Sequence, residues 1–276
     1  MGSVLVINGD NYLYNVILGR LLGPAIYREA ALIIILLLVL SFLGTTFQLA
    51  TAKFAILFIY DDWIAIKQLL YTYALCFWML IGIFIFALAN NLLVKHYFDT
   101  VNTGLYSSLA MIWHVVYFVA WMFGMLLLPA VVQKQKGGEA TAPILIKYIS
   151  YVGVLAISII FCCAVFPEFI MPLIFGEAYI SIVTLLWQYT LATSLLAISN
   201  IFAYYFLSLN QYVTFILSGV LGISQIVMII FFHSTLYMVV QIQIIAMVAL
   251  LVAQLFYFTH NNILNKTTSS YRPRKI

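Results

Sequence analysis

Charged side chains are scarce in this sequence. Asp, Glu, Lys and Arg make up 7% of its 276 residues, against about 25% in ordinary soluble domains. One long run, Ala178–Asn265, contains no charged residue at all. A soluble domain of this size needs a charged surface, so the shortage excludes a water-soluble globular protein and predicts a chain that lies in lipid.

Cysteine is also scarce, which argues against a disulfide scaffold. The three cysteines, Cys76, Cys162 and Cys163, lie in apolar runs with no charged residue or histidine within four positions. A metal site needs further ligands at suitable spacing, and a disulfide needs an aqueous oxidising location. We therefore interpret all three as small core residues.

Motifs that carry enzyme chemistry are missing. The sequence has no nucleotide-binding loop, no His-Glu-x-x-His motif, no nucleophile elbow and no suitably spaced pair of carboxylates at a membrane edge. We expect neither an enzyme nor a bound cofactor. A membrane-bound glycosyltransferase stays a third option, but a metal site needs several converging oxygen ligands. The acids near predicted helix ends show no recognisable spacing: Asp61, Asp62, Asp99, Glu168 and Glu177.

What the sequence has in abundance is apolar residues, at 66% with a mean hydropathy of +1.12. Inside hydrocarbon every backbone polar group must be paired, which leaves helices and closed barrels. Unbroken apolar runs of about 20 residues or more select helices. The sequence therefore predicts an all-α, polytopic transmembrane bundle of about eight helices. Five are expected over about Ser3–Gly19, Ala25–Tyr60, Trp63–Phe98, Thr103–Val132 and Pro143–Phe166.

Three more helices are expected in the charge-free run, with turns at Ser208–Gln211 and His233–Thr235. Pro167, Pro172 and Gly176 predict an irregular connection before that run. The basic tail, residues 261–276, is expected to be a solvated end.

Lys and Arg are expected to mark the cytoplasmic side, because loops rich in them stay there. With eight crossings, both termini lie in the cytoplasm of a multi-pass protein of the cell (plasma or inner) membrane. The first helix contains Asn8, Asp10 and Asn11, so whether it crosses decides where the N-terminus lies. Nine basic residues then fall on the cytoplasmic side: Lys53, Lys67, Lys134, Lys136, Lys147, Lys266, Arg272, Arg274 and Lys275. Three fall outside: Arg20, Arg28 and Lys95.

Polar side chains within the helices are the candidate site residues, because a charge at bilayer depth costs about 2.5 to 3.5 kcal/mol on insertion scales. Asn91 and Lys95 are four residues apart and share one helix face. Together they suit a phosphate or carboxylate, although Lys95 could also be an interfacial anchor. Lys53 either faces a cavity or snorkels. His114 is either packed by hydrogen bonds or part of a proton relay. No acid lies inside helices three to eight, so proton coupling has little support.

Three segments resemble the oligosaccharide flippase family, the exporters of polysaccharide biosynthesis. The first carries Arg20-Leu21-Leu22-Gly23-Pro24 and, later, Lys53, although Arg28 stands where the family has a small residue. The second is Asn90–Gly138, with Leu92-Leu93-Val94-Lys95. The third is Phe166–Tyr179, with Pro172-Leu173-Ile174-Phe175-Gly176-Glu177.

The resemblance implies two six-helix lobes around a central cavity, and movement of polyprenyl-pyrophosphate-linked oligosaccharides across the membrane. On this hypothesis Arg20, Lys53 and Lys95 attract the pyrophosphate, and the substrate-binding set is Arg20, Lys53, Asn91, Lys95 and His114. The lipid bilayer and the lipid-linked oligosaccharide are then the partners. Nucleic acid is not expected as a partner.

The resemblance also implies a shortened first lobe, because the second helix runs almost directly into the family's seventh. About four helices are missing on this alignment. We expect residues 1–62 to be a two-helix remnant of the first lobe, 63–260 a six-helix second lobe and 261–276 the tail. Alternating access needs two bodies, so a second copy or another polysaccharide-assembly membrane protein could complete the transporter. The alternative is a non-transporting membrane scaffold or an inactive relic.

Overall fold

The structure is a computed structural model that describes residues 12–31, 33–34, 37, 90–209, 211 and 213–270, with the backbone alone at 113–118, 121, 136, 215 and 262–270. All regular secondary structure within these residues is helical, which confirms the all-α class. Two helical stretches, 12–31 and 90–97, precede the labelled elements. These are α3 (Thr100–Lys136), α4 (Ala142–Val165), α5 (Pro167–Phe175), η2 (Glu177–Leu185), α6 (Leu186–Ser208), α7 (Val213–Phe231) and α8 (Leu236–Ser270).

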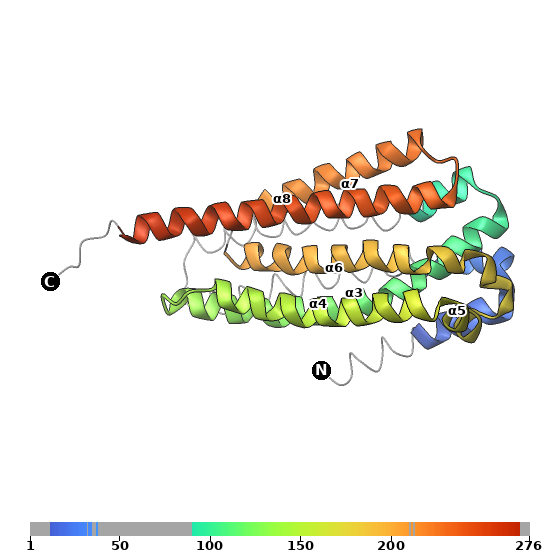
Figure 1. Cartoon of the computed structure of the whole chain (residues 1–276), viewed down its shortest axis with the longest axis horizontal. Coiled ribbons are helices and arrows are strands. Elements are labelled where there is room, and N and C mark those ends of the chain that lie inside the picture. Colours follow the sequence, from blue (N-terminus) through green and yellow to red (C-terminus); the bar gives the residue numbers. More distant parts are fainter. Residues whose placement is uncertain are drawn as a thin grey trace.

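The long helices run up and down beside one another (Figure 1). α6 is central and packs mainly against α3, α8 and α4, whereas α7 packs chiefly against α8. Short turns join α3 to α4, α6 to α7 and α7 to α8, whereas α5 and η2 connect α4 to α6 at one end of the bundle. Successive long helices therefore alternate in direction. The bundle therefore has two ends. We call the end with residues 95–100, 166–177 and 232–235 the Arg28 end, and the end with residues 134–141 and 209–211 the Lys134 end.

The predicted turns in the charge-free run are confirmed. α6 ends at Ser208 and α7 begins at Val213, while α7 ends at Phe231 and α8 begins at Leu236. The second turn starts α8 with a cap, because the Thr235 hydroxyl accepts a hydrogen bond from the Met238 amide at 3.2 Å. Polar residues in an otherwise apolar run thus mark the points where the chain leaves the bundle.

The connection after α4 differs from the irregular segment that we expected. Pro167 begins the nine-residue helix α5, where a missing amide hydrogen costs nothing. Gly176, at φ 98°, ends α5, and the 3-10 helix η2 leads into α6. Proline here starts a helix instead of preventing one. Near the C-terminus, α8 continues to Ser270. Residues 261–270, which we expected in the tail, therefore belong to the last helix.

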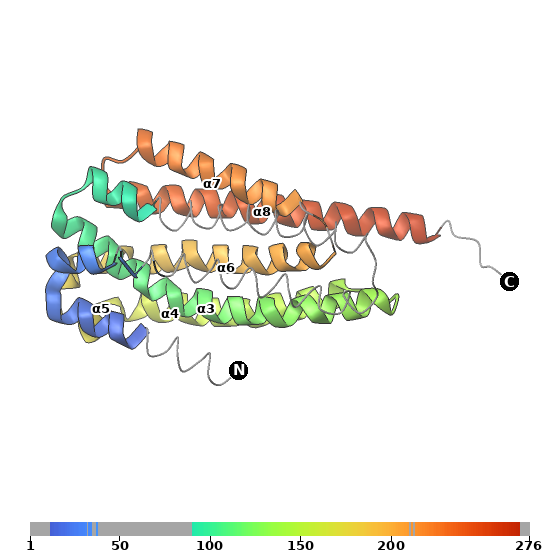
Figure 2. The same ribbon diagram turned by 180° about the vertical axis from the view of Figure 1, so that it is seen from behind.

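Residues 12–31 form the helical start of the described chain and break at Gly23, whose φ of 69° is left-handed. This confirms the turn predicted from Gly23-Pro24, because glycine adopts positive φ at little cost. Figure 2 shows this segment, in blue, at one end of the bundle beside α5. Most of the second and third predicted helices lies outside the described residues.

Two apolar clusters form the core. The one toward the Arg28 end joins residues 12–31 to the bundle, with Tyr27, Tyr106, Phe175 and Tyr179 almost fully buried. The cluster toward the Lys134 end unites α3, α4 and α6, and its members include Leu127, Leu145, Val152, Ile201 and Phe206. The N-terminal segment is therefore packed into the bundle.

Within the described residues, three helical stretches are long and apolar enough to cross a membrane: Ala142–Val165, Glu177–Ser208 and Leu236–Asn261. Ile216–Phe231 is apolar but shorter. Exposed large apolar side chains cover α4, α7 and α8, such as Ile157, Val220 and Phe256. A helix that exposes its apolar side chains and buries its polar ones is built for lipid, so these spans indicate a membrane protein.

Candidate functional site: the charged cluster at the Arg28 end

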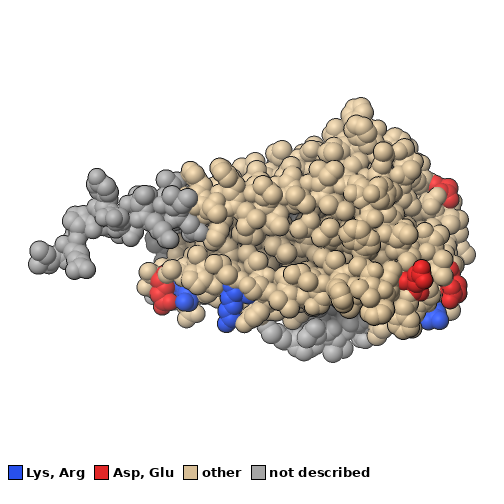
Figure 3. Space-filling model, viewed as in Figure 1, with Lys and Arg blue, Asp and Glu red and all other residues tan. Residues whose placement is uncertain are grey.

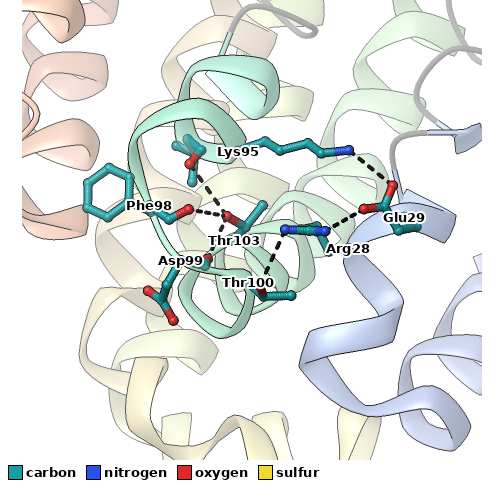
Figure 4. Close-up of polar contacts among 8 residues, drawn as sticks. Arg28, Glu29, Lys95, Phe98, Asp99, Thr100 and Thr103 are labelled. Atoms are coloured by element: carbon teal, nitrogen blue, oxygen red, sulfur yellow. Dashed lines mark hydrogen bonds and ion pairs between the residues drawn. The ribbon is translucent and has the colours of Figure 1, made fainter.

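Four side chains from two parts of the chain meet at the Arg28 end, and we call them the charged cluster: Arg28, Glu29, Lys95 and Thr100 (Figure 4). The two oxygens of the Glu29 carboxylate form separate ion pairs. One lies 2.6 Å from Arg28 Nη2 and the other 3.0 Å from Lys95 Nζ. Arg28 Nη1 donates to the Thr100 hydroxyl at 3.4 Å. One carboxylate is therefore shared by two cations that lie far apart in the sequence.

The close approach of two backbones positions this cluster. A Cβ on Gly104 of α3 would lie 1.7 Å from the Pro24 carbonyl oxygen, so no larger residue fits there without a backbone shift. One turn beyond Pro24, Arg28 meets Thr100, which is one turn before Gly104. The two segments therefore run antiparallel at this contact. The helix break at Gly23 sends the chain into this path.

A bend before α3 sets the position of Lys95. The 90–97 helix ends at Phe98-Asp99, and α3 begins at Thr100. The Thr103 hydroxyl lies 2.9 Å from the Asp99 carbonyl oxygen and within reach of those of Val94 and Phe98. The Asn102 amide donates to the Asp99 carboxylate, which holds the pKa of Asp99 below its ordinary value. The bend is thus fixed by its own side chains.

The cluster carries two positive charges and one negative. Hydrogen bonds from Lys95 and then from Arg28 hold the pKa of Glu29 below its ordinary value, so this carboxylate is ionised at neutral pH. The side chains are 23% exposed at Arg28, 33% at Lys95 and 56% at Glu29, so the cations are the better covered partners. Arg28 Nε is buried and has no hydrogen-bond partner in the described part of the chain. Chemically, the cluster is an ion triplet in which two cations bind one carboxylate.

Arg20, one of the sequence-predicted site residues, lies at the same end but has a different contact. Its Nη1 donates to the Leu173 carbonyl at 3.1 Å, in the last turn of α5. The Tyr179 hydroxyl in turn donates to the Gly19 carbonyl at 2.9 Å. Both acceptors are carbonyls near the C-terminal end of a helical segment, where carbonyl groups have no partner within the helix. The observed contact of Arg20 is a helix cap.

The other predicted site residues are only partly described. Asn91 and Lys95 do share the 90–97 helix, but Asn91 is 7% exposed and lies one turn deeper in the bundle. His114 lies near the middle of α3, and its side chain is outside the description, as is the whole of Lys53. The structure therefore brings Lys95 into the cluster and separates Arg20 from it.

Sequence reasoning missed Glu29. It falls inside the helix expected over Ala25–Tyr60, directly after Arg28, and was not considered as a site residue. Its importance arises from Lys95, 66 positions away, which no local pattern reveals. One signal was available: Glu29 lies beside Arg28, which departs from the small residue found in the flippase family that the sequence resembles.

Amide side chains buried between helices were missed as well. Gln225 Nε2 in α7 donates to Asn90 Oδ1 at 3.0 Å, and Gln243 in α8 donates to the Tyr106 hydroxyl in α3. Ser199 in α6 donates to Gln254 in α8 at 2.7 Å. Polar groups inside a membrane bundle need such partners across helices. These pairs fix which faces of α7 and α8 turn inward.

Described charges gather at the two ends, as Figure 3 shows on one face. The Arg28 end holds three basic residues with four acidic ones: Arg20, Arg28 and Lys95 with Glu29, Asp99, Glu168 and Glu177. At the Lys134 end, Lys134 pairs with Glu139 at 3.0 Å, and Lys147 lies little more than one turn into α4. Within the described residues, no group of three or more His, Cys, Asp or Glu side chains could hold a metal ion.

Comparisons with protein-family models, with curated proteins and with solved structures found no match to this chain.

Proposed function

We propose that this chain is a multi-pass membrane protein that moves a polyprenyl-pyrophosphate-linked oligosaccharide between the leaflets of the cell membrane. The observation that carries the proposal is the charged cluster, in which Lys95 and Arg28 converge on one carboxylate. A pyrophosphate has the oxygen atoms and the negative charge that such a pair of cations prefers. We therefore add Arg28 to the proposed binding residues beside Lys95. Glu29 occupies the position that the pyrophosphate would take.

The location of the cluster is compatible with one step of transport. Arg28, Glu29 and Lys95 lie at the end of the bundle and each side chain is partly exposed, so in a bilayer we expect this end to lie among the headgroups. A pyrophosphate at this depth would leave its polyprenyl chain in the membrane and its sugars in water. The cluster therefore suits the arrival or release of the headgroup, and Glu29 would give up its cations to the incoming phosphate.

The distribution of charge supports an orientation. Among the described residues, the Lys134 end carries four basic residues and the Arg28 end carries three. These are Lys134, Lys136, Lys147 and Lys266 against Arg20, Arg28 and Lys95. Since Lys and Arg are retained on the cytoplasmic side, we place the Lys134 end in the cytoplasm and the charged cluster on the opposite surface. Release of an exported headgroup then takes place at the Arg28 end.

The second candidate function is a membrane scaffold that transports nothing. It is favoured by the contact of Arg20, whose guanidinium caps α5 and thus has a structural partner. On this alternative, Glu29 with its two cations is a clasp that holds residues 24–31 against α3. A second copy or another polysaccharide-assembly membrane protein would then be the partner of the bundle.

Transport into liposomes separates the two candidates. Purified protein is reconstituted with a labelled undecaprenyl-pyrophosphate-linked oligosaccharide, and the fraction of glycan shielded from an external lectin is followed over time. We expect transport above protein-free liposomes, slowed about tenfold in Lys95→Gln through loss of a charged hydrogen bond. Lys134→Gln, which removes a charge at the opposite end, should transport as the unaltered chain does.

Transport no faster than in protein-free liposomes, with the protein correctly inserted, would reject the transport proposal and leave the scaffold. Equal rates in Lys95→Gln and the unaltered chain would remove the charged cluster from the mechanism.

A further inference from the structure

We propose that Lys147, together with Tyr148 and Tyr151, forms a binding site for the headgroup of an anionic phospholipid at the Lys134 end of α4. The site lies at the opposite end of the bundle from the charged cluster. It depends only on the chain lying in a bilayer, and so does not rest on the transport proposal.

Helix α4 faces lipid more than the other candidate spans do. Only 17% of its apolar window is buried within the bundle, against 56% for Glu177–Ser208 and 39% for Leu236–Asn261. Its exposed side chains include Val154, Ile157 and Phe161. Lipid molecules are therefore the neighbours of this helix over most of its circumference, including the face that carries Lys147 and Tyr151.

Lys147 is a cation without an acidic partner in the described part of the chain. Lys134 pairs with Glu139, and both Arg28 and Lys95 pair with Glu29. Lys147 instead places its Nζ 5.9 Å from the centre of the Tyr151 ring. A lysine at this depth extends toward the headgroups, and anionic lipids attract such a cation. The phosphate of a lipid would supply the negative charge that no described side chain places next to Lys147.

Aromatic rings give the site its shape. Tyr148 and Tyr151 lie 6.4 Å apart between ring centres, and both approach Phe123 of α3 at 5.9 Å. Tyrosine rings prefer the membrane interface, with the ring among the acyl chains and the hydroxyl near water. Lys147, whose ammonium lies over the Tyr151 ring, can contact a phosphate while the tyrosine rings pack on the glycerol and upper acyl carbons.

Lipid binding by the full-length protein tests the proposal. Native mass spectrometry of detergent-solubilised protein is recorded with phosphatidylglycerol, and then with phosphatidylcholine of the same acyl chains. We expect phosphatidylglycerol to be retained in preference, with about a fivefold loss of affinity in Lys147→Gln. Lys134→Gln is the matched control, because it removes the same charge at the same end from a lysine that already has a partner.

Two further variants keep the test decisive if Lys147→Gln does not fold. Lys147→Arg should retain the preference for phosphatidylglycerol, and Tyr151→Leu should weaken binding of this lipid while the charge remains. The proposal is overturned if phosphatidylcholine binds as well as phosphatidylglycerol, if Lys147→Gln binds as the unaltered protein does, or if Lys134→Gln loses as much.

Discussion

Gly104 of α3 lies against the carbonyl oxygen of Pro24, with space for no side chain between them. A Cβ at position 104 would lie 1.7 Å from that oxygen. This contact seats residues 24–31 on α3 and thereby allows Arg28 and Glu29 to reach Thr100 and Lys95. The geometry of the charged cluster therefore depends on a glycine that belongs to no charged motif.

Replacing this glycine should loosen the N-terminal segment. In Gly104→Ala the new methyl group meets backbone atoms, which cannot rotate away, so we expect destabilisation of at least about 1–3 kcal/mol. Denaturant unfolding in detergent would measure it. The matched control is Gly153→Ala in α4, where nothing lies within 4 Å of the added Cβ. That variant should be unchanged or slightly more stable, since alanine favours helix. Equal stability of both variants would contradict the close contact.

Removing the two helix caps should affect stability and leave headgroup binding intact. Tyr179→Phe leaves the Gly19 carbonyl without its donor in a buried position, so we expect a loss of about 1–3 kcal/mol. Arg20→Ala should cost less, about 0.5–1.5 kcal/mol, because its bond to Leu173 is exposed. Unfolding in detergent measures both losses. If Arg20→Ala weakens headgroup binding as strongly as Lys95→Gln does, Arg20 is a binding residue and its role as a cap is secondary.

Acid should release the segment that Glu29 holds. The folded pKa of Glu29 lies below its ordinary value, so its stabilising effect is fully present at neutral pH and is lost as the pH falls through the folded pKa. We expect lower protection factors, which correct for the pH dependence of amide exchange itself, in residues 24–31 below the usual titration range of a carboxyl group. In Glu29→Gln the protection factors of this segment should be low already at neutral pH and should not change with acid through this range. A Glu29→Gln variant with the same pH dependence as the unaltered chain would rule out this carboxylate as the cause.

The buried amide pairs should stabilise the bundle only modestly. Gln243→Leu removes the hydrogen bond to Tyr106 while keeping side-chain size, and interhelical hydrogen bonds in membranes average about 0.6 kcal/mol. A double-mutant cycle with Tyr106→Phe, read by unfolding in detergent, isolates this energy. A coupling energy indistinguishable from zero would mean that the pair does not hold α8 against α3.

Cysteine labelling in cells tests the orientation. In a chain whose three native cysteines are replaced by alanine, a membrane-impermeant thiol reagent should label Asp99→Cys in intact cells, because we place the Arg28 end outside. Glu139→Cys, in the loop after α3, should react only after the membrane is permeabilised. The reverse labelling pattern would mean that the protein has the opposite orientation, with the charged cluster at the cytoplasmic surface.

From residue 100 onward, the sequence predicted the long helices well because one strong signal, hydropathy, determines them. The turns around Ser208 and His233 were located from a few polar residues in an apolar run, and the break at Gly23-Pro24 from its turn chemistry. The connection at Pro167 was predicted as irregular, since the two prolines outweighed the helical tendency of the residues between them. Proline at the first position of a helix favours the helix, whereas proline elsewhere interrupts it. Only the backbone structure shows which of the two applies to Pro167.

The candidate site could be predicted only in part. Lys95 was selected because a charge within a membrane helix is costly and because Lys95 shares one helix face with Asn91. Its partner Glu29 belongs to another segment, and their contact depends on a backbone approach at Gly104 that no periodicity encodes. Arg20 was selected from its charge and from the resemblance carried by Arg20-Leu21-Leu22-Gly23-Pro24, yet its contact is with a main-chain carbonyl. Charge scarcity thus identifies which residues matter, whereas tertiary packing decides what they contact.

Equilibrium binding of undecaprenyl pyrophosphate to the purified chain tests most directly whether the cluster is an anion receptor that Glu29 occupies. Because the carboxylate competes with the ligand for Lys95 and Arg28, Glu29→Gln should bind the lipid more tightly than the unaltered chain, and Lys95→Gln should bind it about tenfold more weakly. Binding that is unchanged in both variants would show that these three side chains only join two helices.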